Sequence, residues 1–322
     1  GLIGSIAVYI NDEKIEDTDR TTPESIEIQK HLAMMVEKNV DVAVIEVSSQ
    51  AMKLDRVTGC EFDVGLFTNL TEDHISPKEH PTMEDYFNCK LELLKISKHA
   101  VINNDDETVR KIKDLLPEKD IRTFSIENNS DFKVNPNNIV ITDSYIDFSI
   151  MFNEKEERIK ACIPGKFSVY NASGAIAVSS YFGVTPDEIR EALKTLKVLG
   201  RSELVDNKLG LTIMIDYAHT PSSLESILTA VKSYAKGKII CAWGVGGDRD
   251  AAKRPIMGEI SGRLADYTVL MSDQVRTEDP LKILKEIETG IIPTGKPYKI
   301  IVDRTEGIRY AISIATVSYT HL

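Results

Sequence analysis

Cysteine is scarce and scattered in this sequence. The 322 residues include four cysteines, Cys60, Cys89, Cys162 and Cys241, and no Cys-x-x-Cys pair. Disulfide frameworks and zinc sites need more cysteines at closer, repeated spacings. The pattern excludes a small disulfide-stapled domain and a cysteine-based zinc site, and isolated thiols of this kind favour a cytoplasmic location.

Long hydrophobic runs are missing as well. No stretch approaches the ~18 consecutive apolar residues of a membrane-spanning helix, and the chain does not open with a signal peptide. We therefore expect no membrane span. The ends look unlike natural ones, because Gly1 leads directly into a strand-like segment and a helical segment runs uncapped into Val317–Leu322. We expect an internal part of a longer protein, whose last six residues resemble a translated cloning adaptor.

Basic residues are fewer than acidic residues in this sequence. Lys and Arg number 39 against 50 Asp and Glu, which gives a formal net charge of −11, and no basic cluster carries interleaved aromatic residues. A chain of this charge is a poor binder of phosphate backbones, so we expect no nucleic-acid partner. A phosphorylated small molecule is still compatible with the charge if carboxylates of the chain hold a metal ion.

The common nucleotide-binding glycine signatures are absent. The sequence contains neither Gly-x-Gly-x-x-Gly nor Gly-x-x-x-x-Gly-Lys-Ser/Thr. A different glycine-rich turn, 244–247, precedes Asp248, Arg249 and Asp250 at a strand-to-helix junction. Such a junction is suited to anion binding at a helix N-terminus, although the dense charges also fit a solvated helix start.

Alternating strand and helix patterns occupy most of the chain. Hydrophobic residues make up 42%, enough to fill the cores of about two domains at this length. Buried strands are predicted at 41–47, 63–68 and 100–102, and amphipathic helices at 25–38 and 86–97. This alternation predicts an α/β fold, with a doubly wound, largely parallel sheet that helices cover on both faces.

Two features divide the rest of the chain. Residues 138–162 alternate with period two around a turn, which predicts an antiparallel hairpin. Beyond residue 198 the strand and helix pattern starts again, which predicts a second, Rossmann-like α/β unit. Its expected strands are 211–216, 238–243, 267–271 and 298–302, and its expected helices are 223–234, 251–264 and 280–289. We therefore predict two domains, 1–197 and 198–322.

Polar residues follow several predicted strands at their carboxyl ends. Glu46, with Ser48 behind it, ends one strand, and His74 lies just past the next. Ligands of doubly wound sheets bind outside these strand ends, and an unpaired carboxylate beside an apolar strand is costly. A carboxylate and an imidazole could together bind a divalent ion. A capping cluster and a structural histidine are the alternatives.

The second predicted domain repeats this arrangement. Asp216 and His219 follow one of its strands, and Asp273 and Arg276 follow another. A purely structural rim would need only turn-forming residues at these points. Because the polar residues gather at one edge of each sheet, we expect a site between the domains.

A series of short segments, in order along residues 1–315, closely resembles the Mur ligase family and, within it, the MurE type. The matching segments are Thr21-Thr22-Pro23, Glu46–Gln50, Phe67–His74, Tyr86–Lys90, Asn104–Glu107, Pro164–Asn171, Gly200-Arg201, Asp216–Pro221 and Gly246–Arg249. The number of segments and their order make the resemblance specific.

The resemblance implies an ATP-dependent ligase of peptidoglycan precursor synthesis, and hence a role in cell-wall formation, cell shape and division. Such enzymes convert the D-glutamyl carboxylate of UDP-MurNAc-L-Ala-D-Glu to an acyl phosphate, which the amine of a diamino acid then attacks. Two anions must meet in the first step, and Mg²⁺ stabilises that charge. The implied cofactors are ATP and Mg²⁺, and the implied partners are the UDP-MurNAc-dipeptide and a diamino acid.

The resemblance also assigns residues. Glu46, His74 and Lys90 match the magnesium ligands, with Lys90 carried as a carbamate, which offers oxygen donors that an ammonium lacks. From the residues alone, Lys90 is only one position of an amphipathic helix. The positions matching substrate and nucleotide contacts are Thr21, Thr22, Ser48 and Arg56 for the UDP-MurNAc-dipeptide, Asn171, Arg201 and Asp216 for ATP, and Arg249, Asp273 and Arg276 for the amino acid.

Arg276 bears on the choice of amino acid. A guanidinium there can pair bidentately with the additional carboxylate of meso-diaminopimelate, which lysine lacks. The family signature for diaminopimelate is Asp-Asn-Pro-Arg, whereas this chain has Asp273-Gln274-Val275-Arg276. Diaminopimelate is therefore favoured, with lysine and ornithine as the alternatives.

Other family segments are not found in the sequence. These are the phosphate-binding Gly-Thr-Asn-Gly-Lys-Thr loop, the uridine-binding domain before it, and the later Gly-Lys-Gly-His-Glu segment. We therefore expect this chain by itself to bind ATP poorly and not to turn over. A folylpolyglutamate synthase-like ligase, a MurC or MurF type and a non-catalytic binding paralogue are further alternatives. We expect a cytoplasmic monomer.

Overall fold

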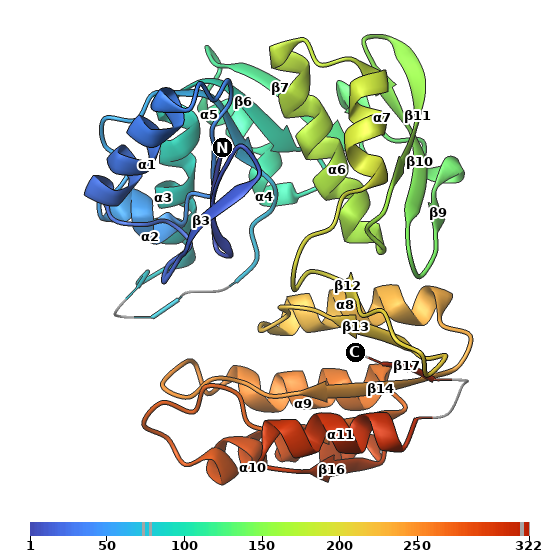
Figure 1. Cartoon of the computed structure of the whole chain (residues 1–322). Helices are drawn as coiled ribbons and strands as arrows, with labels where there is room; N and C mark the ends of the chain where they lie inside the picture. Colours follow the sequence, from blue (N-terminus) through green and yellow to red (C-terminus); the bar gives the residue numbers. More distant parts are fainter. Residues whose placement is uncertain (73–74, 77–78, 316–318, 322) are drawn as a thin grey trace. The chain divides into compact units, whose positions relative to one another are not determined.

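The computed structural model describes residues 1–72, 75–76, 79–315 and 319–321, and its elements are labelled in Figure 1. The chain forms two compact units. The first contains residues 1–134, 150–155 and 170–185, and the second contains residues 135–149, 156–169 and 186–322. The predicted division at residue 198 stays a prediction.

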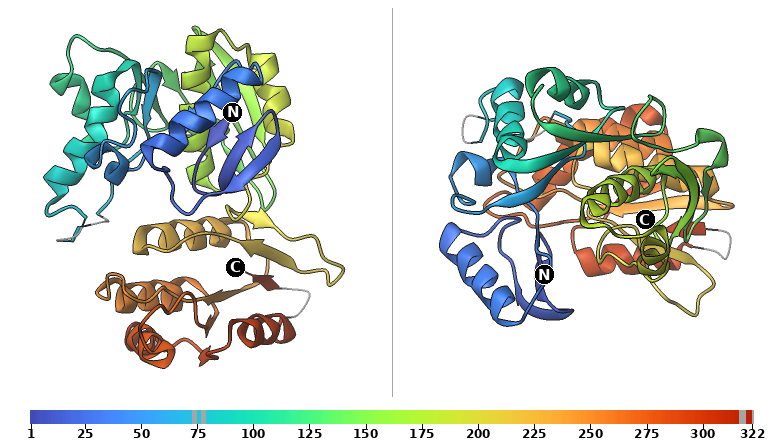
Figure 2. Two further views of the ribbon diagram at one scale, coloured as in Figure 1. Left: turned by 60° about the vertical axis from the view of Figure 1, so that its left-hand side comes forward. Right: turned by 90° about the horizontal axis from the view of Figure 1, so that it is seen from above.

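The first unit begins with a small mixed sheet of order β3-β2-β1-β4. Its strands are β1 (Leu2–Ile3), β2 (Ala7–Ile10), β3 (Glu13–Asp17) and β4 (Val44–Ile45). Only β1 and β4 are parallel neighbours. Helix α1 (Ser25–Glu37) has a capping box of Glu24 and Glu27 at its start. It packs Leu32 and Met35 against β1 and β2. The helix and these strands are the blue part of the chain in Figure 2.

The predicted buried strand 41–47 is wrong in extent and burial. The structure has only β4 there, and the Val42 and Val44 side chains are 47% and 56% exposed. Among the described residues β4 pairs with β1 alone, so its other edge has no strand to extend the ladder. The short helix α2 (Ser49–Lys53) follows.

The second sheet of this unit is fully parallel, in the order β5-β6-β7-β8. Its elements in chain order are β5 (Phe62–Phe67), α3 (Met83–Ile96), β6 (Ser97–Asn103), α4 (Glu107–Arg110), α5 (Ile112–Leu115), β7 (Asp120–Ser125) and β8 (Phe132–Lys133). Helices α3, α4 and α5 cover one face around buried Leu94 and Ile102.

The other face of that sheet is covered by α6 (Lys166–Ser179). A Cβ on Gly174 would lie 3.3 Å from Phe124 Cζ and 3.4 Å from Leu66 Cδ1, so the helix approaches the strands closely here. The predicted α/β layering is thus confirmed for this sheet. The predicted single sheet is instead two, because β4 and β5 belong to different sheets.

The predicted antiparallel hairpin is present as a three-stranded sheet of order β11-β10-β9. Its strands are β9 (Val140–Ile141), β10 (Ile146–Phe152) and β11 (Lys155–Ala161). Asn153 and Glu154 between β10 and β11 both have positive φ, as type I′ hairpin turns require. Helix α7 (Pro186–Lys194) comes later in the chain.

The second unit contains a six-stranded sheet of order β12-β13-β17-β14-β15-β16, in which only β12 is antiparallel to its neighbour. Its elements are β12 (Glu203–Leu204), β13 (Thr212–Ile215), α8 (Pro221–Tyr234), β14 (Lys238–Trp243), α9 (Lys253–Leu264), β15 (Tyr267–Leu270), α10 (Pro280–Ile291), β16 (Tyr298–Ile300), α11 (Arg304–Ser313) and β17 (Tyr319–His321). The predicted alternation of strands and helices is confirmed.

Helices cover both faces of this sheet (Figures 1 and 2). Successive residues of β14 point to opposite faces. Ile239 and Cys241 join the core formed with α8, α9 and α10. Ile240 joins Val269 and Ala311, a residue of α11, in the core on the opposite face. Among the described residues, no helix has the length and apolar character needed to cross a membrane.

Candidate functional site

The carboxylate of Glu46 lies directly after β4 and is held by Ser5. Glu46 Oε2 accepts hydrogen bonds from Ser5 N at 2.9 Å and from Ser5 Oγ at 2.8 Å. Ser5 Oγ also lies 2.9 Å from Thr21 Oγ1. Ser5 has no counterpart in the sequence predictions, since nothing local distinguishes it from other loop serines. These contacts orient one oxygen of the predicted metal ligand.

Thr22, Ser48 and Arg56 gather around the same strand end. Buried Thr22 donates from Oγ1 to Glu46 O at 2.8 Å and accepts from Ser48 N at 2.9 Å. Ser48 Oγ accepts from Ala51 N at 3.1 Å and caps α2, so the capping alternative is confirmed for this serine. Arg56 Nη1 donates to Thr22 O at 3.1 Å. The structure therefore brings the predicted dipeptide-binding residues together with Glu46.

Lys90 lies in α3, whose start is capped by Thr82. Its Nζ is 5.1 Å from the centre of the Tyr86 ring and 5.9 Å from that of Phe67, the last residue of β5. An ammonium in this position is stabilised by the negative faces of both rings. His74, the third predicted magnesium ligand, lies outside the described residues.

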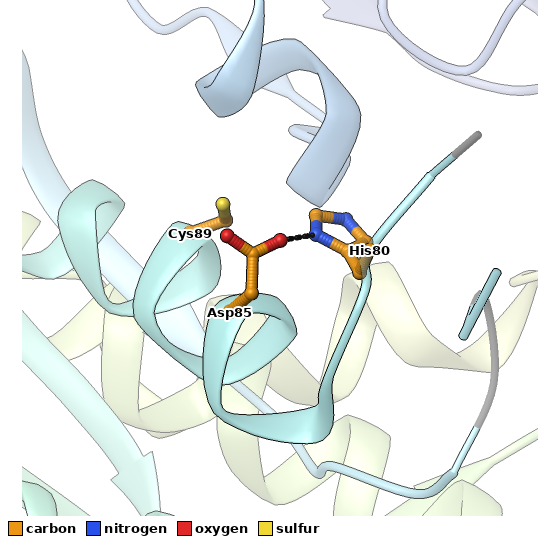
Figure 3. Close-up of side chains that lie close together, drawn as sticks. All are labelled: His80, Asp85 and Cys89. Carbon is orange, nitrogen blue, oxygen red and sulfur yellow. Dashed lines mark hydrogen bonds and ion pairs between the residues drawn. The ribbon is translucent and has the colours of Figure 1, made fainter. Parts of the chain in front are cut away.

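A group of side chains beside Lys90 was missed by the sequence predictions. His80, Asp85 and Cys89 lie with their ligand atoms within 4.8 Å of one another (Figure 3). Lys53 Nζ, however, lies 2.9 Å from Asp85 Oδ2, and that oxygen also faces His80. The ammonium of Lys53 therefore occupies the position at the Asp85 carboxylate that a metal ion would take.

The carboxylate of Asp105 binds Tyr170, the residue before Asn171. This carboxylate accepts from the backbone N–H groups of Ile126, Glu127 and Asn128, and Tyr170 donates its hydroxyl to it at 3.0 Å. Burial opposes ionisation of Asp105, but these hydrogen bonds outweigh it and lower the pKa of the carboxyl below its ordinary value. Asn171, the next residue, is exposed on α6 of the first unit.

Arg201 and Asp216 are neighbours in the second unit. Asp216 accepts from Ser202 N and Ala218 N, both at 2.8 Å. Ser202 has a φ of 47°, so the carboxylate holds a loop residue in the left-handed region. The guanidinium of exposed Arg201 lies 4.7 Å from the centre of the Tyr217 ring. The two predicted ATP contacts of this unit are thus brought together.

The glycine-rich turn packs against the loop after β15. Gly247 N donates to Gln274 O at 2.9 Å. A Cβ on Gly244 would lie 2.0 Å from Met271 O, and one on Gly247 would lie 2.0 Å from Val275 O. Both glycines are therefore required by the neighbouring backbone. This explains the turn without invoking a phosphate.

The predicted amino-acid contacts lie on these two loops. Arg276, at a φ of 51°, donates from Nη1 to Gly247 O. Asp273 pairs with Arg304 at 2.7 Å, and both side chains are largely exposed. Arg249 is also exposed. The loops place Arg276 beside the glycine turn, and Arg249 follows that turn by two residues.

A buried ion cluster beneath these loops was also missed. The side chain of Arg254 is 1% exposed, donates to both oxygens of Glu278 at 2.9 and 2.7 Å, and donates to Glu286 at 2.6 Å. Glu278 also accepts from Asp248 N at 2.6 Å. Arg254 first, and then this backbone bond, lower the pKa of Glu278 to about 2. The sequence offers a solvated helix start as the alternative for the dense charges after the glycine-rich turn, whereas Arg254 in that helix is buried.

Comparison with protein families identifies both halves of the chain. Residues 1–179 match the Mur ligase middle domain, and residues 200–319 match the Mur ligase glutamate ligase domain. The chain is 43% identical over 319 residues to the UDP-N-acetylmuramoyl-L-alanyl-D-glutamate–2,6-diaminopimelate ligase of Clostridium botulinum, and 41% identical over 316 residues to that of Caldanaerobacter subterraneus. Each alignment covers 98% of this chain and 64% of the relative.

Solved structures agree with this family. A structure of a ligase with the same name superposes with a TM-score of 0.68 at 26% identity, over 99% of this chain and 66% of that one. Folylpolyglutamate synthase of Mycobacterium tuberculosis reaches a TM-score of 0.72 at 16% identity, which shows a shared fold. Because a family model matches more than half of its residues, the chain belongs to the Mur ligase family.

Proposed function

We propose that this chain supplies the middle and C-terminal parts of an ATP-dependent ligase that joins meso-diaminopimelate to UDP-MurNAc-L-Ala-D-Glu in peptidoglycan precursor synthesis. The observation that carries the proposal is the 43% identity to a ligase of that name over 98% of the chain. The chain spans 64% of that relative's length. We also propose a cytoplasmic monomer with no nucleic-acid partner.

Arg56 supports binding of an anionic substrate at the first site. Its side chain is 11% exposed, and its buried Nε has no hydrogen-bond partner among the described residues. Its guanidinium contacts Thr22 O through Nη1 and Glu24 through Nη2, so it lies at this strand end with the planar positive charge that is suited to carboxylate or phosphate oxygens. We assign Arg56, with Thr21, Thr22 and Ser48, to the UDP-MurNAc-dipeptide.

Magnesium is the ion that the family resemblance implies, and part of its donor set fits. Glu46 offers a carboxylate oxygen, the kind of donor that Mg²⁺ prefers, and Ser5 fixes its orientation. Lys90 becomes an oxygen donor only as a carbamate. We propose that Glu46, His74 and carbamylated Lys90 hold the ion. When bound, the ion would offset the negative charge of the ATP phosphates.

We assign Asn171, Arg201 and Asp216 to ATP. Asp216 already accepts two backbone hydrogen bonds, so its role is to hold the loop that presents Arg201. The exposed guanidinium of Arg201 is suited to pair with phosphate oxygens. It retains N–H donors beside its contact with the Tyr217 ring.

We assign Arg249, Asp273 and Arg276 to the diamino acid. Arg276 uses one N–H on Gly247 O, and a guanidinium carries five in a planar fork. The others can pair with the additional carboxylate of diaminopimelate. Gln274 and Val275 contribute backbone contacts to the glycine turn, so the departure from Asp-Asn-Pro-Arg leaves the loop held in place.

Phosphate release tests the proposal. The assay contains UDP-MurNAc-L-Ala-D-Glu, ATP and Mg²⁺, with meso-diaminopimelate, L-lysine or L-ornithine offered in turn. It is run on residues 1–322 alone and on a longer polypeptide that joins them to the parts of the curated relatives that this chain does not cover. We expect release only with diaminopimelate, and only from the longer polypeptide.

A matched pair of variants assigns Arg276. Arg276→Lys should raise the KM for diaminopimelate at least about tenfold, because a bidentate charged contact is lost. Arg263→Lys, on the exposed surface of α9, should leave it unchanged. Phosphate release with lysine or ornithine instead would contradict the assignment of diaminopimelate as the substrate. No release from the longer polypeptide with any of the three amino acids would contradict the proposed ligase activity.

A further inference from the structure

His80 is completely buried, with an exposed fraction of 0%, and both of its ring nitrogens have partners. Nδ1 lies 2.7 Å from Asp85 Oδ2, in the first turn of α3 (Figure 3). Nε2 lies 2.9 Å from Ser49 Oγ, in the first residue of α2. One imidazole thus joins the starts of two helices.

The direction of the hydrogen bond between His80 and Asp85 follows from the charge of Asp85. Lys53 donates to the same carboxylate at 2.9 Å, and Lys53 first, then His80, lower its pKa. An ionised carboxylate only accepts, so His80 Nδ1 donates to it. Nε2 completes the network through its hydrogen bond with the Ser49 hydroxyl at 2.9 Å. The four side chains form a hydrogen-bonded network that is satisfied within the protein, and such a network restricts the motion of its members.

Two other roles for these residues fail on the geometry. His80, Asp85 and Cys89 are close enough to share a metal ion, but the Lys53 ammonium is already bound to Asp85 Oδ2. The Ser49–His80–Asp85 distances also resemble a nucleophilic triad. Ser49, however, is only 5% exposed, so a substrate cannot reach its hydroxyl.

The network ends close to two of the three proposed magnesium ligands, Glu46, three residues before the start of α2, and Lys90, in α3. Ser49 follows Ser48, whose backbone N–H binds Thr22, and Thr22 in turn binds the Glu46 carbonyl. In the other direction the His80 ring lies 5.1 Å from that of Tyr86. The Tyr86 ring lies 5.1 Å from Lys90 Nζ. Contacts therefore run from the strand end of Glu46 through His80 and Tyr86 to Lys90.

We propose that His80 is a positioning residue, which holds Tyr86 and thereby fixes the Lys90 side chain relative to the strand end of Glu46. The catalytic consequence rests on the proposed function, whereas the positioning itself does not. Two measurements separate these statements.

The first measurement is the acetylation rate of Lys90 in the chain as printed, by limiting acetic anhydride and peptide mass spectrometry. In His80→Gln the Tyr86 ring loses its contact with the imidazole and is held less firmly over Lys90. Lys90 should then react about two- to fivefold faster, the factor of one lost cation–π contact. Exposed Lys98 is the internal reference and should not change.

His99→Gln is the matched control. His99 also pairs with a carboxylate, that of Asp120 at 2.7 Å, and stacks on a tyrosine ring, that of Tyr181 at 4.6 Å, but it lies outside the network. Its substitution should leave Lys90 at the wild-type rate. A wild-type rate in folded His80→Gln would overturn the proposal. If that variant does not fold, Ser49→Ala removes only one hydrogen bond and must shift the rate in the same direction.

The second measurement uses the longer polypeptide and its ligase activity. His80→Gln should lower kcat by about tenfold or more, as loss of a supporting partner of a metal site does, while the KM for diaminopimelate stays unchanged. His99→Gln should alter neither. An unchanged kcat alongside faster acetylation would reject the catalytic consequence. A wild-type enzyme without activity would reject the proposed function, and the acetylation rates would still decide the role of His80.

Discussion

Arg254 shows how a buried charge is accommodated at the level of single residues. A guanidinium removed from water needs charged partners that also complete its hydrogen bonds. Glu278 meets it through two parallel bonds and Glu286 through a third. Glu278 is additionally bonded to Asp248 N, so the same carboxylate links α9 to both loops that carry the proposed amino-acid contacts.

The pH dependence of stability reports on this cluster. The folded pKa of Glu278 is about 2, below the value of about 4.3 for an unfolded chain. A depressed carboxyl pKa stabilises the fold above about pH 4.3, and this stabilisation is lost as pH falls toward 2. Glu278→Gln cannot titrate. We expect its Tm to be lower than wild type at pH 6 and to fall less between pH 6 and pH 3, as followed by circular dichroism.

Glu225→Gln is the control for that experiment. Glu225 pairs with Arg263 at 2.7 Å, but both side chains are nearly half exposed, and exposed pairs contribute little. Its Tm should follow the wild-type dependence on pH. An acid slope in Glu278→Gln equal to that of wild type would contradict the assigned pairing.

Helices α9 and α10 illustrate the element scale, because their contact depends on two glycines. A Cβ on Gly258 would lie 2.2 Å from Ile287 O, and one on Gly290 would lie 1.8 Å from Pro255 O. Glycine is disfavoured in a helix interior by about 1 kcal/mol relative to alanine. Here the close approach of the partner backbone requires it.

Gly290→Ala should therefore destabilise the protein, although alanine is the better helix former. We expect the free energy of unfolding in urea to fall by about 1–3 kcal/mol, the usual range for overpacking. Thr289→Ala changes the adjacent exposed residue of α10 and should be neutral or stabilising by up to about 0.7 kcal/mol. Equal or greater stability in Gly290→Ala would show that the helices separate without cost.

At the scale of the whole molecule, the main core of the second unit is local in the sequence. The buried residues of this core, among those that the structure describes, lie between Met214 and Ile291, within the predicted domain 198–322. Phe167 packs against this core from α6 but is only partly buried. We therefore propose that the second domain begins near residue 198.

Residues 198–322 expressed alone test this boundary. Since the buried core is retained, we expect a cooperative thermal transition and dispersed amide resonances. Residues 186–322, which add α7, are the matched comparison. Cooperative unfolding of the longer segment together with a molten shorter one would move the boundary to about residue 186.

Several members of the candidate site could be selected from local patterns in the sequence, and the residues that were missed share a cause. Glu46, Ser48 and Asp216 were found because they follow apolar strands, a local signal. Ser5, His80 and Arg254 were missed because each has a partner far away in the sequence, at separations of 41, 31 and 24 residues respectively. No periodicity or turn chemistry links residues at such separations.

The sequence by itself determined the alternation of strands and helices, the hairpin and the family, because hydrophobic periodicity, turn residues and ordered motifs are all written along the chain. Tertiary structure alone decided that β4 and β5 join different sheets, that Arg254 is buried, and that His80 connects α2 to α3. Strand pairing and helix packing bring together groups far apart in sequence, and the charge and burial of each side chain follow from those contacts.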